Sequence, residues 1–249
     1  MAEPDSSQQA MPTTPLELTD VTKRYGETTA LDLEGATLAF RPGEFHGLVG
    51  PNGSGKTTLF RLLTGLSRPT SGTLERGEAT VGYSFQEPRF YPSLTARENL
   101  EVFRGFVGDP PPDSWIETLL EELRLEPAAH RRADELSGGF RKKLDLSLAL
   151  VKRPQFLLLD EPLADVDDHS RRRIRAFLES YQSGTIEGGR GDESALEPNS
   201  GDRTVVISTH NVDAFESALD RVTVLVDGTL RADGEPEADV VEQYRNALE

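Results

Sequence analysis

The sequence feature that most constrains the fold is the stretch GPNGSGKT at residues 50–57, which stands between an apolar run and an amphipathic run. The preceding residues, EFHGLV, favour a buried strand, and KTTLFRLLTGL at 56–66 has the apolar spacing of a helix. A strand that ends in a glycine-rich loop and continues into a helix can bind phosphate groups through its backbone N–H groups. A chance match in a glycine-rich loop is the alternative, and the flanking strand and helix patterns argue against it.

Each residue type in this loop has a physical task. Glycine lets the backbone turn its N–H groups inward, Lys56 supplies positive charge for the β- and γ-phosphate oxygens, and Thr57 offers a hydroxyl to Mg²⁺. The sequence therefore predicts a site for a phosphate-bearing nucleotide with Mg²⁺. The predicted binding residues are Gly50, Pro51, Asn52, Gly53, Ser54, Gly55, Lys56, Thr57 and Thr58.

Short apolar runs alternate with helical patterns along most of the chain, which predicts an α/β fold. Runs such as FLLLD at 156–160 are typical of parallel strands buried on both faces. Helical patterns predominate from about 88 to 154, so we expect a mainly parallel sheet with an antiparallel edge and an inserted helical subdomain over 88–154. The expected strands are 16–22, 37–40, 44–50, 81–86, 156–160 and 204–209 with a hairpin at 221–230, and the expected helices are 56–66, 94–106, 113–125, 137–152 and 170–181.

Charge and composition exclude several classes of protein. The chain has 43 acidic against 27 basic residues, and the net charge of -16 repels phosphodiester backbones, so we expect no nucleic acid partner. The acidic residues are spread along the chain, a pattern that fits a halophile's protein as well as an ordinary acidic subunit. The absence of cysteine excludes disulfides and thiolate metal sites.

Two segments lack the periodicity of a folded element. Residues 1–14 are polar and have no apolar stretch, so we expect a disordered tail and not a signal peptide, followed by the folded domain over 15–249. Residues 183–202 are rich in Gly, Ser and acidic residues, which predicts a mobile acidic insertion. No apolar run approaches the roughly 18 to 20 residues of a membrane helix.

A second motif, FLLLDEP at 156–162, places two carboxylates at the end of a buried strand. The carboxyl ends of parallel strands open into the crevice where α/β proteins bind ligands, so Asp160 is a candidate ligand of Mg²⁺. Glu161 is placed to orient or deprotonate a water molecule. The alternative, that both residues only cap the following loop, is weakened by the phosphate loop earlier in the chain.

A third motif, LSGG at 136–139, opens an amphipathic run. A Ser hydroxyl and bare glycine backbone at a helix N-terminus suit an anion, so Ser137, Gly138 and Gly139 form a second candidate phosphate contact. Taken alone, the turn fits a simple helix cap equally well, because Ser is a favoured N-cap residue.

The order of these motifs, followed by STH at 208–210, resembles that of the ATP-binding subunits of ABC transporters. The resemblance covers about residues 16 to 235, and LSGG between the other two motifs is its most specific element. It implies a P-loop NTPase fold of the RecA-like type. It also implies roles for Tyr25 as the aromatic that stacks on adenine and for Gln86 as a contact to Mg²⁺ and the attacking water. By the same resemblance, Asp167 touches the partner subunit and His210 contacts the γ-phosphate.

In the resembled family, the LSGG turn of one subunit closes over the γ-phosphate of ATP held by the other. The resemblance therefore implies ATP and Mg²⁺ as ligands, and a homodimer or a heterodimer with a second ATP-binding subunit. ATP hydrolysis would drive a substrate through a separate integral membrane permease, with this chain as a peripheral subunit on the cytoplasmic face of the cell membrane. Neither the substrate nor the direction of transport follows from the sequence.

The sequence departs from the family pattern at two positions. Phe140 stands where the family usually has Gln, which predicts fewer polar contacts without loss of activity, and Asp165 adds a charge at the subunit junction. The alternative function is that of a soluble ABC-type ATPase of an assembly complex, such as iron-sulfur cluster assembly. A small-molecule kinase or GTPase is not supported, because no N-K-x-D motif is present. His46, His130 and His169 are interpreted as structural or surface residues.

Overall fold

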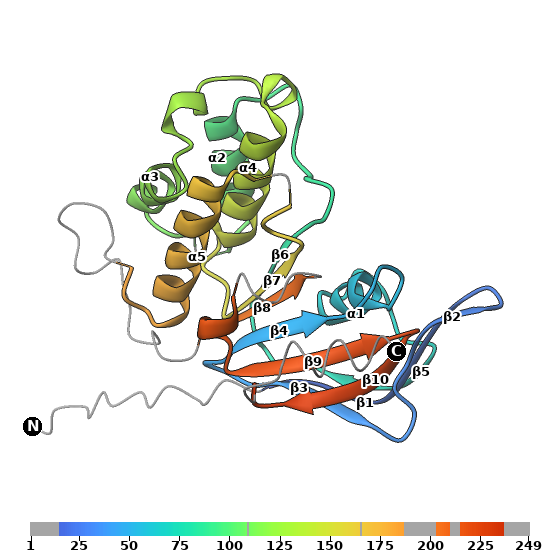
Figure 1. The fold of residues 1–249 in the computed structure, drawn as a ribbon. Coiled ribbons are helices and arrows are strands. Elements are labelled where there is room, and N and C mark those ends of the chain that lie inside the picture. Colours follow the sequence, from blue (N-terminus) through green and yellow to red (C-terminus); the bar gives the residue numbers. More distant parts are fainter. Residues whose placement is uncertain (1–14, 109, 165, 187–202, 210–214, 237–249) are drawn as a thin grey trace, which may run out of the picture.

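The computed structural model describes residues 15–108, 110–164, 166–186, 203–209 and 215–236, which build a mixed sheet with helices packed against both of its faces (Figure 1). The predicted tail 1–14 lies outside the described residues, and only 183–186 of the predicted insertion lie within them. The strands are β1 (Leu16–Tyr25), β2 (Thr28–Asp32), β3 (Thr37–Phe40), β4 (Phe45–Val49), β5 (Ser71–Glu75), β6 (Val81–Ser84), β7 (Phe156–Asp160), β8 (Thr204–Thr209), β9 (Arg221–Val226) and β10 (Thr229–Gly234). The helices are α1 (Lys56–Leu63), α2 (Ala96–Gly105), α3 (Asp113–Glu122), α4 (Gly138–Leu150) and α5 (Asp168–Gln182), with short 3-10 turns η1 (Glu126–Ala128), η2 (Ala133–Glu135) and η5 (Glu216–Ala218).

The sheet has a parallel part and an antiparallel part. Its strand order is β3-β1-β2-β10-β9-β4-β8-β7-β6, and β5 pairs with β1. The strands β9, β4, β8, β7 and β6 pair in parallel, whereas β1 pairs antiparallel with β2, β3 and β5. The predicted α/β class, with its mainly parallel sheet and antiparallel edge, is therefore confirmed.

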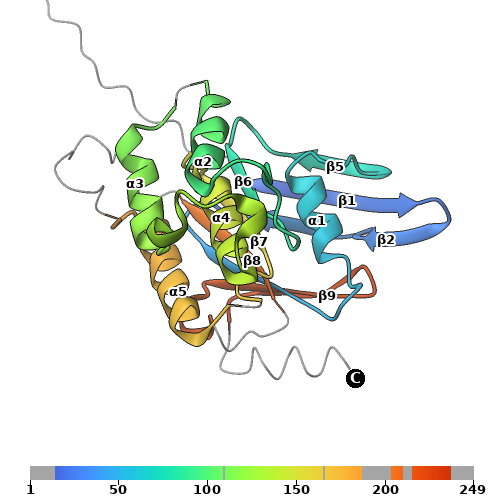
Figure 2. The same ribbon diagram turned by 90° about the horizontal axis from the view of Figure 1, so that it is seen from above.

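The parallel strands are buried because alternate residues enter two different cores. In β7, Leu157 and Leu159 belong to the core that contains α2, α3, α4 and α5, whereas Phe156 and Leu158 belong to the core that contains α1 and β1. This explains the uninterrupted apolar run in the sequence, since a strand covered on both faces has no polar side. Figure 2 shows α2, α3 and α4 gathered beside the end of the sheet formed by β6 and β7.

The N-terminal strands extend further than the sequence pattern predicted. β1 continues to Tyr25, and β2 (Thr28–Asp32) pairs with it through the facing residues Tyr25 and Thr28. The two strands form a hairpin whose turn contains Gly26 at φ 60. The strand β2 was not predicted, because its alternation of exposed and buried residues spans only five positions.

Candidate nucleotide-binding site

The phosphate loop joins β4 to α1 and depends on glycine at two positions. A Cβ atom at Gly50 would lie 2.1 Å from the Leu225 carbonyl oxygen, so no larger residue fits between β4 and β9 without moving the backbone. Gly55, the N-cap of α1, has φ 101, and a Cβ there would lie 2.7 Å from the Ala30 carbonyl oxygen. The glycines therefore let the loop fold closely over neighbouring backbone at the N-terminus of α1, where N–H groups favour anions.

Lys56, the first residue of α1, holds its ammonium group inside this loop. Its Nζ donates hydrogen bonds to the Gly50 carbonyl at 2.7 Å and to the Pro51 carbonyl at 3.0 Å. Burial lowers the pKa of Lys56, and the charges of Glu161 and Asp160 oppose this effect. The Lys56 ammonium group is already buried and bound to two carbonyls. It therefore does not have to lose a full water shell before it binds phosphate oxygens.

Asp160 lies at the end of β7 and accepts hydrogen bonds from three hydroxyl groups. Thr57 Oγ1 donates to its Oδ2 at 2.7 Å, and the Tyr83 hydroxyl donates to the same oxygen at 3.3 Å. Ser208 Oγ donates to Oδ1 at 2.5 Å. Burial, and after it the Asp160 charge, raise the pKa of Tyr83, which keeps that hydroxyl protonated as a donor. The predicted pair Thr57 and Asp160, 103 residues apart in the chain, therefore meets in space.

Glu161 leaves the strand in an uncommon backbone conformation. Its φ is 51, in the left-handed region that non-glycine residues seldom adopt. Its backbone N–H donates to both the carbonyl and the Oγ of Ser208, each at 3.2 Å. Ser208 therefore holds the carboxylate of Asp160 and the backbone of Glu161 at the same time. Backbone strain of this kind is often found at functional sites.

One cleft of about 260 Å³ collects most of the predicted site residues. It brings together the phosphate loop, Gln86 after β6, and both Asp160 and Glu161 after β7. These residues lie at or just after the carboxyl ends of β4, β6 and β7 in the parallel part of the sheet. The ends of parallel strands lie at the same edge, so motifs that are far apart in the chain come together there. The lining residues are Ala30, Asn52, Gly53, Ser54, Gly55, Lys56, Thr57, Thr58, Gln86, Asp160 and Glu161.

Sequence reasoning missed the contributions of Ser208 and Tyr83. Both lie on strands that flank β7, and the β7–β8 register places Ser208 directly opposite Asp160. A polar residue at the carboxyl end of a buried apolar strand, as in TVVIST, is the signal that could have identified Ser208. Tyr83 has no comparable sequence signal, because an aromatic residue in a strand is ordinarily core.

Tyr25 lies at the end of β1 beside the phosphate-loop helix, and 45% of its surface is exposed. Lys23 Nζ lies 4.8 Å from the centre of its ring, within the range of a cation–π contact. Burial would raise the pKa of Tyr25, but hydrogen bonds with the side chains of Ser67 and Arg61, the charge of Lys23 and a hydrogen bond with Thr58 lower it. An exposed ring in this position presents a surface on which a flat base can stack.

The LSGG residues and Asp167 do not line the cleft. Ser137 is the N-cap of α4, and its Oγ accepts a hydrogen bond from the Phe140 N–H at 3.5 Å. Ser137 and Gly138 are exposed, and a Cβ added to Gly138 would meet nothing within 4 Å. Asp167 caps α5 by accepting a hydrogen bond from the Ser170 N–H at 2.9 Å. Hydrogen bonds from the backbone and the side chain of Ser170 lower the pKa of Asp167. This capping role was not anticipated from the sequence.

Of the histidines, His210 lies outside the described residues, as does Asp165. His46 is fully buried on β4, away from the cleft, and His130 and His169 are exposed. Within the described residues, no group of three or more His, Cys, Asp or Glu side chains could hold a metal ion. A metal ion in the cleft would therefore need a mixed set of protein hydroxyl and carboxylate oxygens with phosphate oxygens, and Thr57 and Asp160 are donors of that kind.

Comparisons with known proteins agree with this geometry. The family model described as ABC transporter matches residues 33–164. The chain is 36% identical over 241 residues to Nod factor export ATP-binding protein I of Paraburkholderia xenovorans, a match that covers 92% of this chain and 73% of that protein. It is 34% identical over 235 residues to the xylose/arabinose import ATP-binding protein XacJ of Haloferax volcanii, covering 89% and 56% respectively.

Among solved structures, the dimeric structure of MJ0796, described as a bacterial ABC transporter cassette, superposes with a TM-score of 0.73 at 25% identity. The match covers 90% of this chain and 99% of that one. Both relatives are named as ATP-binding proteins of export or import, so of the two functions left open by the motifs the comparisons support the transporter motor. In the described residues, no helix combines the length and apolar character needed to cross a bilayer.

Proposed function

The chain belongs to the ABC transporter family and is an ATP-binding subunit that hydrolyses ATP to drive transport, and from this premise we propose which of its residues perform each step. The observation that carries the proposal is the hydrogen bond between Thr57 and Asp160 in the cleft below the phosphate loop. It joins the phosphate loop to the carboxyl end of β7. The loop supplies N–H groups and an ammonium group for the triphosphate, and the end of β7 supplies carboxylate oxygens for a divalent cation.

In this proposal, residues 50–58 hold the phosphates of ATP through backbone N–H groups and the Lys56 ammonium. Thr57 and Asp160, with Gln86, are the ligands of Mg²⁺, directly or through water. The bound Mg²⁺ would neutralise charge on the phosphate oxygens. Tyr25 stacks on the adenine ring. The oxygen donors and the neighbouring ammonium group fit a magnesium nucleotide, and Asp160 is kept in place by Ser208.

Glu161 is the proposed general base that orients and deprotonates the attacking water. It lines the cleft next to Asp160, and its backbone is fixed by Ser208. Gln86 approaches the same cleft from the end of β6 and would contact the water and the metal together. His210, outside the described residues, is assigned the γ-phosphate contact on the basis of its position in STH.

A second subunit completes each ATP site in this proposal. Ser137, Gly138 and Gly139 form an anion-suited helix N-terminus, and they do not line the cleft of their own chain. Head-to-tail pairing would place this N-terminus over the γ-phosphate held by the partner, with Asp167 at the junction. The partner is a second copy of this chain or a related ATP-binding subunit. Loss of the γ-phosphate would remove the contact that holds the two together.

The proposed membrane partner docks in an apolar groove of about 350 Å³ between β6, α2 and α4. Leu66 and Phe106 at its rim are 61% and 72% exposed, an unusual state for large apolar side chains. Phe85, in the same groove, precedes Gln86 in the chain, so the occupant of the groove would sense the nucleotide. We assign the groove to an apolar cytoplasmic segment of an integral membrane permease, which makes this chain a peripheral subunit on the cytoplasmic membrane face.

Relatives of similar identity are named for export and for import, so the proposal concerns the motor role and leaves substrate and direction open. The test uses Glu161→Gln, which should leave ATP binding intact, nearly abolish turnover and accumulate an ATP-dependent dimer on a sizing column. Adding Ser137→Arg should prevent this dimer while ATP still binds to the single subunit. Full hydrolysis by Glu161→Gln would refute the general-base role, and dimerisation despite Ser137→Arg would refute the cross-subunit contact.

A further inference from the structure

The segment that follows β6, and that contains Gln86, is tied to α4 by one buried carboxylate. Asp145 Oδ2 accepts hydrogen bonds from Ser84 Oγ and from the Phe85 N–H, both at 2.7 Å. Its Oδ1 accepts from the Arg89 N–H at 2.8 Å. Asp145 is buried, and its three donors lie on both sides of Gln86 in the chain. A carboxylate used in this way fixes the path of the intervening backbone.

Lys142, one turn earlier on α4, binds carbonyl groups of the same segment, whereas Asp145 binds its donors. Its Nζ donates to the Phe85 carbonyl at 3.1 Å and to the Gln86 carbonyl at 2.5 Å. Asp145 and Lys142 are three residues apart and lie on one face of the helix. Together they satisfy backbone N–H and C=O groups that would otherwise be left without partners in a half-buried loop.

The far end of the segment is fastened to another helix of the same subdomain. Asn99 on α2 is fully buried, accepts from the Tyr91 N–H at 2.7 Å and donates to the Tyr91 carbonyl at 3.0 Å. The segment is therefore held by α4 at 84–89 and by α2 at Tyr91. The Gln86 side chain is exposed between these anchors and lines the cleft. A loop anchored at both ends moves with the helices that anchor it.

The helix α4, which holds Lys142 and Asp145, carries the LSGG turn at its N-terminus. Asp145 is eight residues after Ser137, which corresponds to about 12 Å along an α-helix. A helix of this length is stiff, so a displacement of its N-terminus is passed to Lys142 and Asp145. The contacts place one rigid element between Ser137, which does not line the chain's own cleft, and Gln86, which does.

We propose that Asp145 and Lys142 are positioning residues that set the place of Gln86 in the ATP cleft and make it follow the position of α4. The inference rests on the proposed role of Gln86 in hydrolysis. Neither Asp145 nor Lys142 touches the nucleotide, and both act through the Gln86 backbone.

The test is a double-mutant cycle between residues 145 and 86, measured as steady-state ATP hydrolysis by the purified full chain. Asp145→Asn keeps the shape but turns an amide N–H₂ group toward a backbone donor, so kcat should fall by roughly tenfold or more while KM for ATP changes by less than about twofold. Gln86→Ala alone should also lower kcat. If Asp145 acts through Gln86, the double variant should have the kcat of Gln86→Ala within about twofold.

Two further variants keep the result interpretable. Lys142→Met should show the same lack of additivity with Gln86→Ala, and it serves if Asp145→Asn does not fold. Leu119→Ala, which truncates a buried apolar residue of α3, controls for general loss of stability and should change kcat by the same factor whether residue 86 is Gln or Ala.

A failure of the proposed role of Gln86 and a failure of the positioning proposal give different results. A Gln86→Ala variant with normal kcat overturns the catalytic role of Gln86 and, with it, the positioning role of Asp145. A Gln86→Ala variant with low kcat, whose defect is multiplied further by Asp145→Asn or Lys142→Met, leaves the role of Gln86 standing and overturns the positioning proposal alone.

Discussion

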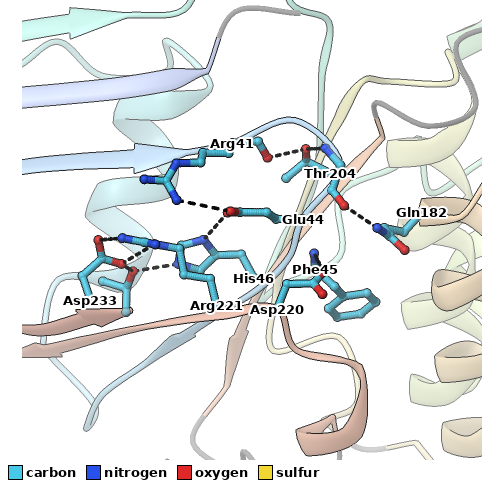
Figure 3. Close-up of polar contacts among 11 residues, drawn as sticks. Arg41, Glu44, Phe45, His46, Gln182, Thr204, Asp220, Arg221 and Asp233 are labelled. Carbon is cyan, nitrogen blue, oxygen red and sulfur yellow. Dashed lines mark hydrogen bonds and ion pairs between the residues drawn. The ribbon is translucent and has the colours of Figure 1, made fainter. Parts of the chain in front are cut away.

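His46 gives the sharpest quantitative prediction, because it is a fully buried imidazole whose protonation should be tied to folding. Figure 3 shows it among the side chains of Arg41, Glu44, Arg221 and Asp233. Its Nε2 lies 2.7 Å from Thr223 Oγ1, and this hydroxyl donates to Asp233 Oδ1 at 2.8 Å. The hydroxyl proton is therefore engaged, so Nε2 must carry the imidazole proton and donate to Thr223. Nδ1 then holds a lone pair, and within the described residues it has no hydrogen-bond partner.

Burial lowers the pKa of His46 from 6.5 to about 3. The charge of Asp233 opposes this effect, and the charges of Arg221 and Arg41 add to it. Because the folded-state pKa is depressed, the unfolded chain takes up the proton first. Stability from this residue is therefore complete above pH 6.5 and is lost as the pH falls from 6.5 toward about 3. At about pH 4.5, two units below the ordinary value, the loss is about 2.7 kcal/mol, a large part of the total stability of an ordinary domain.

The assay is urea unfolding at about pH 7.5 and about pH 4.5, at constant salt, for the wild-type chain, His46→Gln and the exposed control His130→Gln. Gln retains an N–H donor for Thr223 but does not titrate. The loss in free energy of unfolding between the two pH values should be smaller in His46→Gln by about 2.7 kcal/mol, and unchanged in His130→Gln. Equal losses in all three proteins would refute the reasoning.

Glu44 must be separated from this effect. Its Oε2 lies 3.9 Å from His46 Nδ1, and burial raises the pKa of Glu44 despite the nearby Arg41. A raised pKa has the opposite sign, since stability is then present below the ordinary value of 4.5 and lost as the pH rises through the folded-state pKa. Repeating the comparison in a Glu44→Gln background removes the Glu44 contribution from both proteins, and the difference between His and Gln at position 46 should remain about 2.7 kcal/mol.

Two further predictions concern the site. Ser208→Ala removes the hydroxyl shared by Asp160 and Glu161, so kcat should fall by roughly tenfold and the Mg²⁺ dependence of hydrolysis should shift upward. An unchanged magnesium titration would contradict this. Gly138→Ala places a Cβ in open space at a helix start, so the melting temperature should not fall, whereas the ATP-dependent dimer should weaken. A lower melting temperature with an intact dimer would reverse that interpretation.

The fold was predictable from the sequence where periodicity ran long enough. FLLLD and TVVIST became β7 and β8, and the three helical patterns of the insertion became α2, α3 and α4. The ends were predicted less exactly: the helix expected from residue 94 begins after Thr95, whose hydroxyl and the Glu98 carboxylate form a capping box, a local signal that the sequence does carry. The hairpin partner β2 was missed, although the two-residue turn after Tyr25 was a usable signal.

The site was predictable as far as its motifs reach. Lys56, Thr57, Asp160 and Glu161 carry recognisable spacing, and the structure brings them together around one cleft. The residues that hold them were not predictable from spacing alone. The contacts of Ser208 and Asp145 cross 48 and 61 positions of the chain, and only strand register and helix packing bring those positions side by side.

Phe140 shows how one departure from the family pattern is accommodated. The ring is half-buried, packs against the core that contains α4, and lies 5.4 Å from Lys143 Nζ in a cation–π contact. It therefore stabilises the first turn of α4 and offers no hydrogen bond to a ligand. In the proposed dimer, the contact to the partner's γ-phosphate then falls on the Ser137 hydroxyl and on the amides of Gly138 and Gly139. Because only these few groups would bind the γ-phosphate, the contact depends strongly on the position of α4. The same helix is joined to the backbone around Gln86 by Asp145 and Lys142.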